Sequence, residues 1–187
     1  MSQHRNKREA ERSFVDDIQR SLSRFHGRAQ WCLTYGDGDC RVRTIPGLIP
    51  VPCESRSVLY LALVIVFHAE RDEDGRAWQV VVDKYSYALC LNDDLNAEIV
   101  AWHWHPKMDS RSLPHIHVQW KEGPIDDFGR VHFPTSQVTF EQVLLFLMQD
   151  RRIKAIPAAS DAAEYLEQKD ARLGKGLVWL PRWSETE

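Results

Sequence analysis

The feature that most constrains the fold is a nearly continuous apolar run at residues 58–68, VLYLALVIVFH. Its β-branched and aromatic content favours a strand over a helix, and a strand that is apolar at almost every position must be covered on both faces. An acidic turn at 72–75 follows, and residues 77–91 return as a second long strand. Residues 92–96 turn again into a third strand at 97–105. Three strands joined by short turns predict an antiparallel meander.

The segment before the meander is predicted to form one helix and one hairpin. Residues 8–25 form an amphipathic helix, because apolar side chains recur at helical spacing: Phe14, Val15, Ile18, Leu22 and Phe25. Residues 30–35 and 40–45 flank a glycine-rich turn, which is typical of a β-hairpin. The stretch 46–52 holds three prolines, and we interpret it as a rigid connector rather than an element.

The last third of the chain is predicted to be helical. Thr139 and Gln142 match a capping box, and an apolar run at 143–148 follows directly. Residues 160–173 predict a second helix, which the glycines at 174 and 176 end. The tail that begins VWLPRW is too aromatic to be left in water, so we expect it to pack on the body.

These elements predict an α+β fold, in which an N-terminal helix and two C-terminal helices pack on an antiparallel β-sheet meander. A length of 187 residues fits one domain. We assign residues 1–28 to an N-terminal amphipathic helix and residues 29–187 to a single α+β domain. That domain comprises the sheet at 29–133, the helices at 138–173 and an aromatic tail at 177–187.

Composition points to a cytoplasmic protein. No stretch approaches the roughly 20 apolar residues of a membrane span, and no apolar segment follows the basic N-terminus as in a secretory signal. The four cysteines form no CxxC pair, so we expect free thiols in a reducing compartment. The formal net charge of −3 excludes an overall basic protein and argues against an extended nucleic-acid surface.

The candidate functional residues are four histidines in two HxH pairs. Successive side chains of a strand alternate between faces, so His103 and His105 project from one side, and so do His115 and His117. The eight residues 107–114 between the pairs are few enough for the two segments to be adjacent. If the segments pair, the four imidazoles share one face. The other face then carries the apolar neighbours Trp102, Trp104, Ile116 and Val118.

One role for these histidines is metal binding. Neutral imidazole is the commonest metal ligand among side chains, and an HxH pair on a strand places two ligands on one metal. Such a site suits Zn²⁺, Ni²⁺ or Fe²⁺, whereas Mg²⁺ prefers oxygen ligands. The predicted ligands are His103, His105, His115 and His117.

A second role is acid–base catalysis without a metal. One neutral and one protonated imidazole can cleave RNA through its own 2′-hydroxyl, provided that a cation stabilises the phosphorane. Lys107 is the first candidate for that cation, and Arg111 and Arg130 are others. His68 and His132 lie beside strand ends and are weaker candidates for the site. The structural alternative to both roles is a partly exposed aromatic sheet face with hydrogen-bonded rings.

Two tyrosines on the preceding strand are further candidates. Tyr85 and Tyr87 share a face and could flank the histidines, where they would stack on a base or donate a phenol proton. Cross-strand aromatic packing is the more common use of such residues.

Residues 83–150 carry short motifs in a defined order: Tyr85-Ser-Tyr87, the acidic turn Asp93-Asp94, His103-Trp-His105-Pro106, Pro114-His-Ile-His117-Val118 and a final helix at 140–150. This order resembles the TumE-like toxin family of bacterial toxin–antitoxin systems, in which a tyrosine-containing hairpin leads into a histidine-rich loop. The chain departs from that pattern in its added helices and in Trp102 and Trp104. The resemblance implies a small cytosolic toxin that a neighbouring antitoxin neutralises, with its catalytic residues in the histidine cluster.

Three functions therefore remain open. The first is a toxin-like, histidine-dependent ribonuclease, with RNA as substrate and an antitoxin protein as partner. The second is a metal-dependent hydrolase of a small substrate, and the third is a non-catalytic module whose aromatic surface binds another protein.

Overall fold

The computed structural model describes residues 6–25, 30–35, 40–45, 48–53, 57–106, 113–119, 130–149, 160–173 and 178–179. Along the chain its elements are α1 (Lys7–Phe25), β1 (Gln30–Tyr35), β2 (Cys40–Ile45), β3 (Ile49–Pro52), β4 (Val58–Arg71), β5 (Trp78–Cys90), a 3-10 turn η1 (Leu95–Ala97), β6 (Glu98–Trp104), β7 (His115–Gln119), β8 (Arg130–Pro134), α2 (Phe140–Gln149), α3 (Ser160–Leu173) and β9 (Val178–Trp179).

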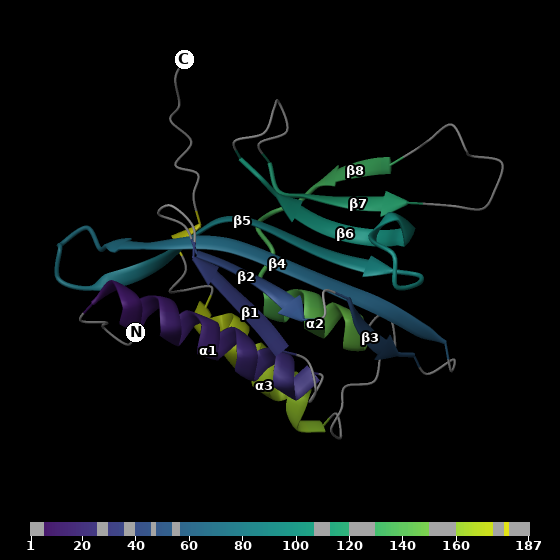
Figure 1. The fold of residues 1–187 in the computed structure, drawn as a ribbon, viewed down its shortest axis with the longest axis horizontal. Coiled ribbons are helices and arrows are strands. Elements are labelled where there is room, and N and C mark those ends of the chain that lie inside the picture. Colours follow the sequence, from purple (N-terminus) through teal and green to yellow (C-terminus); the bar gives the residue numbers. More distant parts are fainter. Residues whose placement is uncertain are drawn as a thin grey trace, which may run out of the picture.

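Within the described residues, the strands form one nine-stranded sheet (Figure 1). Seven of them follow one another in the order β1-β2-β4-β5-β6-β7-β8, and β3 and β9 pair with strands of this series. Strands β4 to β8 are a continuous antiparallel meander. β3 pairs with β4 beside β2, and β9 pairs in parallel with β5 at Val81 and Val82. The predicted α+β fold with one N-terminal and two C-terminal helices is confirmed.

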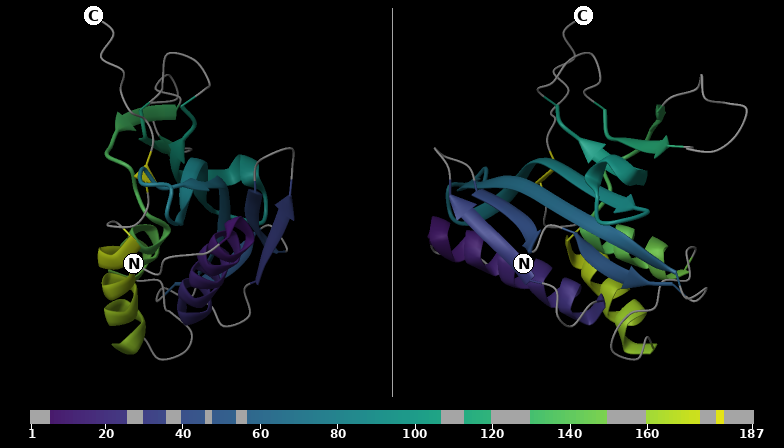
Figure 2. Two further views of the ribbon diagram at one scale, coloured as in Figure 1. Left: turned by 90° about the vertical axis from the view of Figure 1, so that its left-hand side faces the viewer. Right: turned by 45° about the vertical axis from the view of Figure 1, so that its right-hand side comes forward.

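The three helices lie on one face of the sheet, as the two views of Figure 2 show. The core lies between them and the sheet. The apolar stripe of α1, which includes Phe14, Ile18 and Leu22, packs there in one cluster with alternate residues of β4 such as Leu63 and Phe67. The N-terminal helix therefore belongs to the main core, because its apolar stripe packs on the apolar residues of β4.

The prediction of a connector at residues 46–52 is wrong, because Ile49–Pro52 forms strand β3 and pairs with β4. Proline cannot donate to a strand ladder and is therefore found on edge strands. β3 satisfies this rule, since β4 is the only strand with which it pairs among the described residues. Ile49 and Val51 are buried, whereas Pro50 between them is exposed.

Two irregularities in the meander determine which side chains share a face. Between β4 and β5, Val66 pairs with Lys84 but Phe67 pairs with Val82, so Asp83 is an extra residue on β5. Between β5 and β6, Leu89 pairs with Val100 but Cys90 pairs with Glu98, so position 99 is extra on β6. An extra residue shifts the two-residue alternation by one and sends the side chains beyond it to the other face.

The helical layer is held together by polar contacts. The capping box is confirmed, since the amide of Gln142 donates to Thr139 Oγ1 and the amide of Thr139 donates to Gln142 Oε1, both at 3.1 Å. The predicted helix at 160–173 matches α3. Lys169 of α3 forms an ion pair of 2.6 Å with Asp17 of α1.

Other predictions concern thiols, the tail and membranes. Among the described residues, Cys40, Cys53 and Cys90 form no disulfide, as expected. The predicted packing of the tail is confirmed for Val178–Trp179, which form β9, whereas the glycines at 174 and 176 lie outside the described residues. A search of the described helices for a long apolar span that could cross a membrane found none.

A buried carboxyl group in the helical layer predicts a pH-dependent stability. Glu141 of α2 is 1% exposed, and burial raises its pKa from 4.5 to about 7, although Ser21 Oγ of α1 lies 2.6 Å from its Oε1 and favours the charged form. The folded-state pKa of Glu141 is higher than its unfolded value. The protonated carboxyl group therefore contributes fully to the stability of the fold below about pH 4.5, and this stability is lost as the pH rises through about 7. The loss is about 3 kcal/mol at most.

We therefore expect Glu141→Gln to stabilise the protein at pH 8 relative to wild type, and much less at pH 4.5. Urea unfolding at both pH values measures this difference. Glu167→Gln, an exposed position of α3, is the control and should retain the wild-type pH dependence. Identical pH profiles for wild type and Glu141→Gln would show that the buried carboxyl does not titrate in this range.

Candidate metal centre

The structure brings the four predicted histidines together on one face of the sheet. Strands β6 and β7 pair in the predicted way, with His103 opposite His115 and Ala101 opposite His117. Ring centroids are 4.4 Å apart for His103 and His117, 4.8 Å for His115 and His117, and 5.3 Å for His105 and His115. The four imidazoles therefore form a continuous group.

The opposite face of the same strands is apolar, as predicted. Trp102 and Trp104 are 5% and 0% exposed and belong to the main core, and Ile116 and Val118 pack against it. Because the helices cover that face, the histidines lie on the face that points away from them. The alternation of β6 thus sends tryptophans into the core and histidines out of it.

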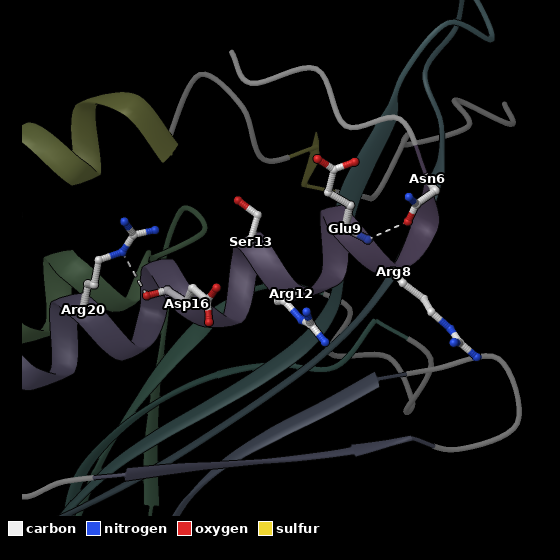
Figure 3. Close-up of a pocket in the computed structure, with 7 residues that line it drawn as sticks. All are labelled: Asn6, Arg8, Glu9, Arg12, Ser13, Asp16 and Arg20. Atoms are coloured by element: carbon white, nitrogen blue, oxygen red, sulfur yellow. Dashed lines mark hydrogen bonds between the residues drawn. The ribbon is translucent and has the colours of Figure 1, made fainter.

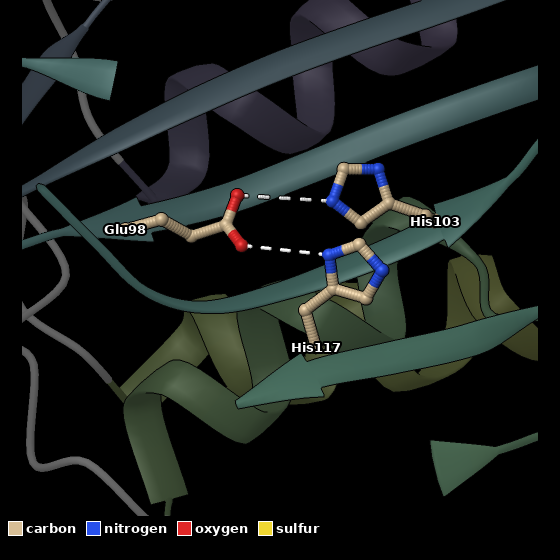
Figure 4. A group of neighbouring side chains, drawn as sticks. All are labelled: Glu98, His103 and His117. Atoms are coloured by element: carbon tan, nitrogen blue, oxygen red, sulfur yellow. Dashed lines mark ion pairs between the residues drawn. The ribbon is translucent and has the colours of Figure 1, made fainter. Parts of the chain in front are cut away.

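The structure adds a residue that the sequence did not indicate, which is Glu98 (Figure 4). Its Oε2 lies 3.8 Å from His103 Nε2, and its Oε1 lies 3.6 Å from His117 Nδ1. The side chains of Glu98, His117 and His103 are only 8%, 9% and 17% exposed. One potential ligand atom from each of these residues lies within 4.8 Å of the others.

The bulge in β6 explains why the sequence does not indicate Glu98. Glu98 and His103 are five positions apart, so a regular strand would place them on opposite faces. The extra residue at position 99 reverses this alternation and turns Glu98 towards the histidines, while Val100 still faces the core. No local pattern in the sequence indicates the bulge.

The two distances from Glu98 to His103 and His117 are close to those between ligands of one cation. Direct N–H···O hydrogen bonds span about 2.7–3.2 Å, and both carboxylate–imidazole distances are longer than that. Ligands bound at about 2.0–2.1 Å around a tetrahedral metal lie about 3.3 Å apart, close to these distances. A carboxylate that is 8% exposed also needs a compensating positive charge, which a metal or a protonated imidazole supplies.

His105 and His115 border the trio without belonging to it. His115 is 5% exposed, and its Nδ1 lies 2.8 Å from the carbonyl oxygen of Leu113. That oxygen can only accept, so Nδ1 carries the proton and Nε2 is the basic nitrogen. Burial lowers the pKa of His105, as do His115, His103 and Lys84, so this imidazole is readily kept uncharged.

The prediction that Tyr85 and Tyr87 flank the histidines is wrong. They pair with Trp104 and Trp102 and share the core face with them, on the far side of the sheet from the imidazoles. They are 3% and 1% exposed, and their rings stack with centroids 4.8 Å apart. Burial raises the pKa of Tyr85 to about 12 and that of Tyr87 well above 10, so neither phenol is an accessible acid.

The predicted cations are not placed at the site by the structure. Lys107 and Arg111 lie outside the described residues. Arg130 and His132 belong to β8, where only the backbone is described, and the register places His132 directly opposite His117. His68 has a different partner, because its Nδ1 is 2.9 Å from Asp83 Oδ2.

A hollow on the outer surface of α1 offers no competing site (Figure 3). It is lined by residues of one helix and of its N-terminal flank: Asn6, Arg8, Glu9, Arg12, Ser13, Asp16 and Arg20. The charges are of both signs, and Arg20 pairs with Asp17 at 2.8 Å. The hollow is a solvated helix surface on the helical side of the sheet, away from the histidine face.

Comparison of the chain with protein-family models, with curated proteins and with solved structures gave no match. The likeness to TumE-like toxins therefore stays a prediction, and the geometry of the site carries the functional information.

The trio predicts stoichiometric metal binding. We expect the purified protein to bind about one equivalent of Zn²⁺ or Co²⁺, with Glu98→Gln and His117→Ala weakening binding by more than the 10- to 100-fold typical of outer-shell changes. Elemental analysis after dialysis measures the amount of bound metal in each protein, and circular dichroism confirms that each protein is folded.

The matched control is His68→Ala, which removes a histidine that pairs with Asp83 outside the trio. It should keep the wild-type metal content. If Glu98→Gln and His117→Ala also kept it, the trio would not be the metal site.

Proposed function

We propose that Glu98, His103 and His117 bind a transition metal and that the protein is a metal-dependent hydrolase. The observation that supports this is the convergence of one buried carboxylate and two imidazoles at 3.6 and 3.8 Å on the face of the sheet. A purely structural role is less well supported, because closed structural sites usually hold four protein ligands.

The donor set favours a catalytic centre. Two histidines and one glutamate are the ligands of a familiar class of catalytic zinc sites, in which the remaining position is left for water or substrate. Nitrogen donors suit Zn²⁺, Fe²⁺ or Ni²⁺ better than Mg²⁺. The bound metal would lower the pKa of a water molecule and polarise the bond to be cleaved.

The arrangement gives each residue a part in the reaction. Glu98 and His117, the most buried of the trio, would fix the metal, and the more exposed His103 marks the side from which solvent and substrate enter. Water oxygen forms a bond to the carbonyl carbon or phosphorus of the substrate, and the bond to the leaving group breaks. The leaving group takes the proton that the water gives up.

A histidine-dependent ribonuclease is the second candidate. The observation that favours it is the proximity of His105 and His115, whose ring centroids are 5.3 Å apart outside the trio. These two could act as acid and base on RNA without a metal. An antitoxin partner would belong to this proposal, as the resemblance to TumE-like toxins implies.

One set of assays separates the two candidates. The metal-loaded and chelator-treated proteins are tested on p-nitrophenyl acetate, bis-p-nitrophenyl phosphate and RNA. The hydrolase proposal expects chelation and Glu98→Gln to reduce turnover at least about 100-fold, since both remove metal-assisted activation of water.

Each pattern of results has one meaning. RNA cleavage that survives chelation and is lost in His105→Ala or His115→Ala would favour the metal-free ribonuclease. Absence of metal-dependent turnover on all three substrates would contradict the hydrolase proposal, even if the metal is bound.

A further inference from the structure

Strand β5 presents two polar side chains beside the proposed metal. Ser86 is the direct cross-strand partner of His103, so the two residues project from the same face of the sheet. Lys84 lies two positions before Ser86 and therefore shares that face. Side chains at directly paired positions have Cβ atoms about 4.5–5.5 Å apart, so Ser86 lies next to a proposed ligand.

A bulge at Asp83 lies directly before these two residues. Val82 and Tyr85 both belong to the core, although a regular strand would not put positions 82 and 85 on one face. The extra residue allows it, while Lys84 and Ser86, which follow the bulge, face the histidines because residues 85–89 pair regularly with β6. Bulges are common next to active sites, where they redirect side chains.

Lys84 and Ser86 have no structural task in the described part of the molecule. Among the described residues, Lys84 forms no salt bridge or side-chain hydrogen bond, and the Ser86 hydroxyl forms no hydrogen bond. The neighbouring Asp83 is held by His68, whose Nδ1 lies 2.9 and 3.0 Å from its two carboxylate oxygens. An ammonium group and a hydroxyl group thus stand beside the metal site as donors without acceptors.

The charges on this face favour an anion. A divalent cation with the single carboxylate Glu98 and two neutral imidazoles has a formal charge of +1, and Lys84 adds another positive charge. The field of a bound metal is often the largest in a site and attracts anionic groups.

We propose that Lys84 and Ser86 form a phosphate subsite and that the substrate of the proposed hydrolase is a phosphate monoester. This inference rests on the proposed function. The phosphoryl group of a monoester has three non-ester oxygens, so it offers the metal one oxygen and each donor another, whereas a carboxylate bound in the same way has one oxygen to share between the two donors. Water attacks phosphorus, the ester P–O bond breaks, and the alcohol leaves with a proton.

The test uses the full-length protein loaded with Co²⁺ and titrated with inorganic phosphate by calorimetry. We expect Lys84→Met to weaken phosphate binding at least 10-fold and Ser86→Ala to weaken it several-fold, while Lys84→Arg retains most of it. Arg76→Met removes an exposed cation in the turn between β4 and β5 and is the control, which should bind as wild type.

A second arm uses turnover and acetate. Lys84→Met should raise KM for p-nitrophenyl phosphate far more than KM for p-nitrophenyl acetate, and acetate should bind weakly to both proteins. Equal phosphate binding by wild type and Lys84→Met would overturn the subsite, and so would acetate binding as tight as phosphate binding.

The Co²⁺ absorption spectrum reports metal binding directly. It therefore distinguishes failure of the phosphate subsite from failure of the proposed metal-dependent hydrolase. A protein that binds Co²⁺ and hydrolyses the acetate ester, but shows no effect of Lys84→Met on phosphate, keeps the hydrolase and loses the subsite. A protein that does not bind Co²⁺ loses both.

Discussion

The structure depends on the antiparallel pairing of β4 with β5. β4 is apolar at almost every position, so it is stable only in the middle of a sheet with cover on both sides. On the side of β4 away from β5, β2 and β3 pair with different parts of the strand. On the side of β5 away from β4, β6 and β9 pair with different parts of that strand. The helices cover the face that holds Leu63 and Phe67, and on the opposite face Ala62 and Val66 are also buried. All other elements are positioned by this pair.

The face that carries the histidines lies where this regular pairing is interrupted. One bulge turns Glu98 towards His103 and His117, and the other lies directly before Lys84 and Ser86, which share that face. A bulge weakens the ladder locally, because one residue is left without a partner. Both bulges lie next to the cluster of imidazoles. The apolar residues on either side of each bulge still pack in the core, so the core remains continuous. The bulge in β6 therefore adds a carboxylate to the histidine face.

Electrostatics explains why this cluster differs from an ordinary polar surface. Glu98 is a nearly buried carboxylate, and its imidazole neighbours lie too far away for short hydrogen bonds. Burial of a charge is costly unless an opposite charge accompanies it. A cation among Glu98, His103 and His117 satisfies the carboxylate and both imidazoles at once, which a proton on one ring does only in part. The same cation would raise the positive potential beside Lys84.

The sequence by itself determined most of the elements and the histidine group. Periodicity located α1, the meander and α3, and the alternation of His103 with Trp102 and Trp104 assigned opposite faces correctly, because both signals depend on neighbours along the chain. The tertiary structure decided what depends on register: β3 as an edge strand, Tyr85 and Tyr87 in the core, and Glu98 beside the histidines. Each bulge shifts the alternation by one residue, and the energy of that shift comes from contacts with distant strands, which no local pattern contains.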